Sequence, residues 1–167
     1  MNGRNKILKV RLKTEGNIVL PLKGRCMEPL LIAGDKVKII PASHYTSGYL
    51  YLFELLDGTL AVHRLVGKTE EFVLLKGDRS RGFETVPYKN IIGLVSEVRL
   101  FNRTQWINIY SYRRSMAIIT YLSKKRMKDK NMGDETMFHR ILDRFYALFL
   151  IVYSYFIRKW WETYPQN

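Results

Sequence analysis

Residues 24–37 have the sequence Gly-Arg-Cys-Met-Glu-Pro-Leu-Leu-Ile-Ala-Gly-Asp-Lys-Val and contain the chain's single cysteine, Cys26. The proline and the Gly34-Asp35 pair indicate a turn-rich loop, in which a side chain at Cys26 can reach the surface. The alternating residues 36–40 that follow predict a half-buried strand. One cysteine cannot form an intramolecular disulfide or build a zinc cluster, so we expect no metal and no cofactor.

The first hundred residues alternate short apolar runs with turn signals. Asp57-Gly58 separates two such runs and predicts a β-hairpin. Strands at this spacing are typical of a compact β-barrel or sandwich. The predicted strands cover residues 18–22, 36–40, 49–56, 60–66, 71–76 and 91–100.

The pattern changes to helical spacing near residue 104. A basic helical segment is expected over 106–130. Apolar residues at helical spacing from Phe138 to Val152 predict a second helix, and Asp134 is the candidate N-cap. We therefore expect a mainly β domain over 1–103 and a basic, aromatic helical extension over 104–167.

The formal net charge of +13 predicts attraction to an acidic partner. Nucleic acid is disfavoured, because the basic helices lack an aromatic stacking pattern and no helix-turn-helix fits before residue 20. An anionic membrane surface and a solvated helix face remain the two alternatives.

Residues 145–157 form an uncharged, mostly apolar run. The run is shorter than the 18–20 residues that a bilayer-spanning helix needs. Its flanks, Arg144 on one side and Arg158 to Trp161 on the other, suit a membrane interface. The alternative is a helix packed on its own domain or on a partner.

Four segments in order resemble the signal peptidase I and S24/S26 peptidase superfamily. The first is the nucleophile box, in which Cys26 stands where the family has serine. The matching positions of that box are Gly24, Met27, Pro29, Gly34 and Asp35. The other segments are His63-Arg64-Leu65-Val66, Lys76-Gly77-Asp78-Arg79-Ser80 and Ile91-Ile92-Gly93. Together they cover about residues 20–98, and the second is similar to signal peptidases that use histidine as the base.

This resemblance implies a signal-peptidase-like β fold and an acyl-transfer site. Cys26 would be the nucleophile and His63 the base, while Met27 and Pro29 would shape the substrate cleft. An acidic residue would orient the imidazole, and the candidates are Asp78, which the sequence favours slightly, and Glu84.

The resemblance predicts an endopeptidase that cleaves a peptide precursor or leader through a Cys–His pair. The alternative is an inactive module of the same fold that binds a peptide or partner without cutting it. The N-terminus lacks an apolar core and a membrane span, so a cytoplasmic protein, or one peripheral on the cytoplasmic membrane face, is expected.

Overall fold

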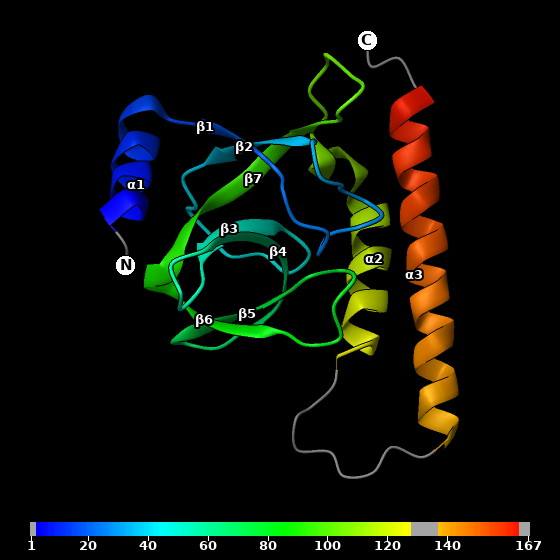
Figure 1. The fold of residues 1–167 in the computed structure, drawn as a ribbon. Coiled ribbons are helices and arrows are strands. Elements are labelled where there is room, and N and C mark those ends of the chain that lie inside the picture. The colour runs from blue at the N-terminus through cyan, green and yellow to red at the C-terminus, as the bar shows by residue number, and fades with distance from the viewer. Residues whose placement is uncertain (1–2, 128–136, 164–167) are drawn as a thin grey trace.

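Seven antiparallel strands in one sheet form the centre of the molecule, a computed structural model that describes residues 3–127 and 137–163 (Figure 1). The strand order is β1-β2-β7-β3-β4-β5-β6. The strands are β1 (Ile18–Pro21), β2 (Lys36–Ile40), β3 (Leu50–Glu54), β4 (Leu60–Lys68), β5 (Phe72–Lys76), β6 (Glu84–Pro87) and β7 (Ile91–Arg99). A mainly β fold with a C-terminal helical extension is thus confirmed.

The β3–β4 hairpin has the turn that the sequence predicts. Asp57 Oδ1 accepts a hydrogen bond from the Thr59 amide at 2.8 Å, and Gly58 has a φ of 81°. A residue with a side chain rarely adopts this φ, so glycine suits the position. The hairpin sets Tyr51 on β3 opposite His63 on β4, which fixes the position of the histidine.

The sheet does not close into a barrel. The strands β1 and β6 lie at the two ends of the strand order, and no pairing joins them among the described strands. Register shifts within the β2–β7, β3–β7 and β4–β5 pairs bend the sheet. Both faces are nevertheless buried, because Leu52 packs in one apolar cluster while its neighbours Tyr51 and Phe53 pack in another.

Two elements within the first hundred residues were not predicted. The helix α1 (Gly3–Glu15) forms in a basic segment for which no element was predicted, and it packs Leu12 against β7 near Gly93. The apolar stripe that this helix packs on the core is narrow and is formed by Leu8 and Leu12, one helical turn apart. The many basic residues around it mask the helical periodicity in the sequence. The short strand β6 was missed as well, because its four residues carry little periodicity.

The helical extension begins with the 3-10 helix η2 (Ile109–Tyr112) and continues as α2 (Arg113–Lys125) and α3 (Met137–Thr163). The expected helix over 106–130 is therefore shorter, and residues 128–130 lie outside the described part, as does the predicted N-cap Asp134. The helix α3 packs on α2 and forms the outermost layer (Figure 1). Leu150 and Trp161 of α3 share an apolar cluster with Leu30 and Leu31, so the extension belongs to the same core as the sheet. Another 3-10 helix, η1 (Tyr88–Asn90), joins β6 to β7.

Within residues 3–127 and 137–163, no helix has both the length and the apolar character needed to cross a membrane.

Candidate active site

The loop between β1 and β2 carries Cys26. Backbone hydrogen bonds close its base, from the Leu22 amide to Asp35 O at 2.8 Å and from the Gly34 amide to Leu22 O at 2.9 Å. Leu30 and Leu31 bury their side chains in the core, while Cys26 stays half-buried as a free thiol. The loop is thus anchored from below and presents Cys26 near the surface.

Asp35 holds this loop to the rest of the molecule. Its buried carboxylate accepts hydrogen bonds from the Ile32 and Phe101 amides, both at 2.9 Å. Arg158 of α3 donates to the same carboxylate at 2.6 Å and to Leu30 O at 3.1 Å. The Gly-Asp pair of the motif therefore joins the Cys26 loop to the C-terminal helix.

His63 lies on β4 with its side chain almost fully buried, beside the ring of Phe53. Its Nδ1 atom is 2.8 Å from Glu84 Oε2, at the start of β6. An ionised carboxylate only accepts hydrogen bonds, so Nδ1 carries the proton in this contact. Glu84 thereby orients the imidazole.

Gly77, in the loop after β5, lies between Cys26 and the other nitrogen of His63. A Cβ atom placed on Gly77 would be 3.1 Å from Cys26 Cβ and 3.2 Å from His63 Nε2. The next loop residues reinforce this contact, because the Arg79 amide donates to Cys26 O at 2.9 Å. The structure therefore brings together a thiol, an imidazole and a carboxylate from three distant segments.

The preference for Asp78 as the partner of His63 is wrong. Both oxygens of Asp78 are engaged by Arg64, at 2.8 and 2.6 Å, and both side chains are fully buried. Arg64 also donates to Gly48 O at 2.9 Å. Adjacent strand residues point to opposite faces, so Arg64 and its partner lie across the sheet from His63. Glu84, the other candidate, occupies the predicted position.

Of the two expected cleft residues, Met27 needs a correction. Its side chain is 2% exposed and belongs to the apolar core, so it anchors the loop and does not line a surface cleft. Pro29 is half-buried in the same loop.

The charge state of His63 depends on opposing influences. Burial lowers its pKa, whereas hydrogen bonds to Cys26 and Glu84 and their negative charge raise it, and the net effect raises the pKa of His63 to about 9. The imidazole therefore carries a positive charge at neutral pH.

A buried lysine, Lys76, supports the loop after β5. Its ammonium donates to Gly77 O at 3.1 Å, to Ser80 O, and to Ser123 Oγ of α2 at 3.3 Å. Burial is the main reason that the pKa of Lys76 is lowered to about 8. Together with Arg126, which donates to Asp78 O at 3.1 Å, Lys76 ties this loop to α2.

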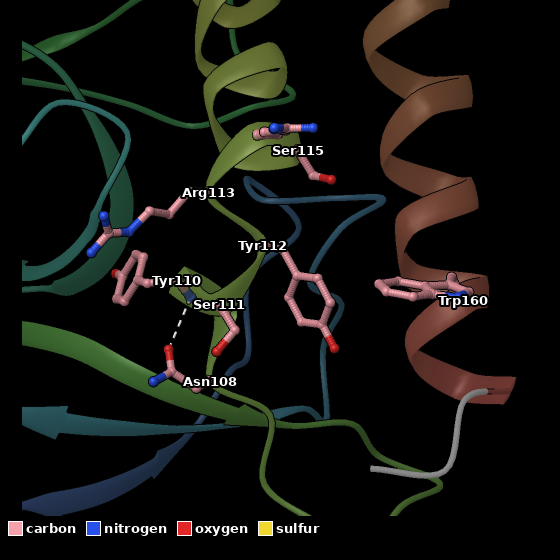
Figure 2. Close-up of a pocket in the computed structure, with 8 residues that line it drawn as sticks. Asn108, Tyr110, Ser111, Tyr112, Arg113, Ser115 and Trp160 are labelled. Carbon is pink, nitrogen blue, oxygen red and sulfur yellow. Dashed lines mark hydrogen bonds between the residues drawn. The ribbon is translucent and has the colours of Figure 1, made fainter.

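Two cavities lie away from Cys26. One, of about 660 Å³, lies where η2 and the start of α2 meet the end of α3, with Tyr112 facing Trp160 (Figure 2). The other, of about 550 Å³, lies between residues 46–49 and α2. Within the described residues, no group of three or more His, Cys, Asp or Glu could hold a metal ion.

Sequence reasoning overlooked two residues that shape this site. Gly77 was seen only as part of a motif, and its closeness to Cys26 depends on tertiary contacts. Arg158 had a signal, because an arginine that follows Leu150 and Ser154 at four-residue spacing lies on the stripe of α3 that faces the core.

No model of a known protein family matches the chain, and no curated protein matches it either. The chemistry of the site is therefore inferred from its geometry and from the motifs in the sequence.

Proposed function

We propose that this chain is an endopeptidase of the S24/S26 signal-peptidase-like class that cleaves a peptide precursor through Cys26 and His63. The observation that supports it most is the position of His63, whose Nδ1 is held by Glu84 at 2.8 Å while Nε2 lies beside Gly77 and Cys26. A nucleophile, a base and an orienting acid in this order are what acyl transfer requires.

In the proposed reaction, the Cys26 thiolate attacks the carbonyl carbon of the scissile peptide bond. The protonated His63 gives its Nε2 proton to the departing amine as the C–N bond breaks, which leaves a thioester on Cys26. The neutral imidazole then takes a proton from water, whose oxygen attacks the thioester carbon. The C–S bond breaks, which releases the carboxylic acid and returns Cys26 as the thiolate beside protonated His63. Glu84 acts as a positioning residue that keeps Nε2 directed at Cys26.

The Cys26 loop would also stabilise the oxyanion. A hydrogen bond from the Glu28 amide to Arg25 O, at 3.2 Å, closes the first turn of this loop. Cys26 and Met27 are the two middle residues of that turn, and their amides come before the Glu28 amide in the chain. Amides at the start of a turn are suited to bind a developing negative charge. A reducing compartment would keep the single cysteine reduced.

The test is cleavage of a mixture of synthetic peptides of diverse sequence, with products identified by mass spectrometry. The wild-type chain is compared with Cys26→Ala, Cys26→Ser and Glu84→Gln. We expect Cys26→Ala to abolish cleavage, Cys26→Ser to keep a fraction of it, and Glu84→Gln to lower kcat more than it raises KM. Cleavage that persists in Cys26→Ala would exclude Cys26 as the nucleophile.

The second candidate function is a binding module that holds a peptide without cutting it. One contact favours it, since the Cys26 thiol is 3.8 Å from Val62 O and can donate to that carbonyl as a neutral group. In that case, the peptides of the mixture would be retained by the wild-type chain and by Cys26→Ala alike, with no new termini.

A further inference from the structure

The two faces of α3 differ sharply in their surroundings. The inward stripe is buried against the loop of Cys26 and against η2, through Leu150, Ser154, Arg158 and Trp161. The outward side carries large apolar side chains that are 40–65% exposed. They are Ile141, Phe145, Leu148, Phe149, Ile151, Val152, Tyr155 and Phe156, which we call the outer face.

The outer face is continuous and without charge over its middle part. Residues 145–157 contain no Asp, Glu, Lys or Arg. From Ile141 to Phe156 the helix rises by about 23 Å. Apolar strips of this extent on a protein surface mark an interaction site with protein or lipid. Among the described residues no element covers it, and α3 is the outermost layer in Figure 1.

Basic residues flank both ends of this strip. At the C-terminal end, Lys159 of α3 is exposed, and the exposed Arg114 lines the same cavity as Trp160. At the N-terminal end are Arg140 and Arg144, both exposed. The end of α2, which carries exposed Lys124 and Lys125, lies at the same end, because Arg126 contacts Asp143 of α3 at 3.7 Å. In a helix that lies parallel to an anionic lipid surface, cations at both ends can reach the headgroups while the apolar strip between them enters the apolar layer.

We propose that the outer face of α3 docks on an anionic lipid bilayer, with the helix lying in the plane of the membrane interface. A second copy of the chain is the main competing occupant. Two chains of net charge +13 repel each other, whereas an anionic surface attracts each of them. Tyr155 adds an aromatic ring of the kind that settles at the headgroup level.

The docked helix would fix the candidate active site relative to the membrane. Arg158 joins α3 to Asp35 and to Leu30 O within the Cys26 loop. A bilayer on the outer face would therefore hold that loop at a set height above the lipid. Docking itself does not depend on whether Cys26 cleaves peptides, so the two proposals can fail separately.

The test is co-sedimentation of the full chain with vesicles of phosphatidylcholine, with and without phosphatidylglycerol. The variant is Phe149→Gln with Phe156→Gln, since both rings are 65% exposed and glutamine is a good helix former. The matched control is Ile7→Gln with Val10→Gln on α1, where the side chains are 68% and 61% exposed. Figure 1 shows α1 at the far side of the molecule from α3, with the strands between them.

We expect binding to vesicles with phosphatidylglycerol, weaker binding to phosphatidylcholine alone, and a loss of at least about tenfold in the Phe149/Phe156 variant. The α1 control should bind like the wild type. No binding to either vesicle would overturn the proposal, and so would a loss confined to the α1 control. Sedimentation that finds a dimer, which the Phe149/Phe156 variant dissolves, would assign the face to a second copy.

Discussion

The imidazole of His63 is held between a thiol and a carboxylate in a buried position. Burial alone would keep it neutral, but Cys26 and Glu84 both favour the charged form, so it stays protonated at neutral pH. The same interactions serve the proposed reaction, since a protonated imidazole can give its proton to a leaving amine.

Alkylation of Cys26 by iodoacetamide at neutral pH measures this pairing directly. We expect the rate to fall at least about tenfold in His63→Ala, because a cysteine beside a protonated histidine reacts faster than an isolated one. His44→Ala is the matched control, since His44 is exposed and contacts Ser43 rather than Cys26. Equal rates in wild type and His63→Ala would contradict a Cys–His pair.

The free energy of unfolding should depend on pH through the same histidine. The pKa of His63 is raised from 6.5 to about 9, so its stabilising contribution is complete below pH 6.5 and is lost as the pH rises through 9. Between pH 6.5 and 8 we expect a loss of about 2 kcal/mol in urea unfolding. Above pH 8, Lys76 acts in the opposite direction, because its lowered pKa of about 8 adds stability as the pH rises.

The control for this pH effect is again at His44. In His63→Gln the decrease between pH 6.5 and 8 should disappear, whereas in His44→Gln it should remain. A decrease of the same size in His63→Gln would mean that another group causes it.

At the scale of elements, the loop after β5 is packed directly on the Cys26 loop. Arg64 and Asp78 fix its position from beneath, and Lys76 and Arg126 tie it to α2. The contact leaves no space for a side chain at Gly77, where a Cβ atom would approach Cys26 O to 2.9 Å.

Gly77→Ala should therefore force the two loops apart. We expect a loss of about 1–3 kcal/mol in the free energy of unfolding. We also expect slower alkylation of Cys26, because His63 Nε2 would no longer lie beside it. The measurements are urea unfolding and the iodoacetamide rate.

Gly82→Ala is the matched control in the same loop, since the nearest atom to its added Cβ is Ser80 Oγ at 3.9 Å. It should change neither quantity appreciably. If Gly77→Ala behaves like Gly82→Ala, the loops are not as closely packed as described.

At the scale of the whole molecule, a buried ion pair joins the C-terminal helix to the loop between β1 and β2. Arg158 and Asp35 are 123 residues apart in sequence, yet they connect α3 to the Cys26 loop. Both side chains are largely withdrawn from water, so removal of one partner leaves a buried charge without compensation.

Arg158→Met should lower the free energy of unfolding by about 3–5 kcal/mol. It should also speed hydrogen exchange in the Cys26 loop, because the loop loses its link to α3. Lys159→Met is the matched control on the adjacent residue, whose exposed pair with Glu162 should contribute far less to the free energy of unfolding. Equal effects of the two variants would argue against the link.

The sequence by itself determined the elements whose signals are local. Alternating apolar residues and the Asp57-Gly58 turn predicted six of the seven strands and the hairpin that carries His63. The single cysteine in a turn-rich loop marked Cys26 as a candidate, and helical spacing predicted α3. The relation of these motifs to signal peptidases stays a prediction.

Only the tertiary structure decided what each side chain contacts. Asp78 and Glu84 are six residues apart in one segment, and the sequence favoured the wrong one because strand pairing, not proximity along the chain, selects the neighbour of His63. The open sheet and the Arg158–Asp35 pair likewise depend on how distant segments pack. Such contacts form between residues far apart in the chain, so no local pattern of residue types encodes them.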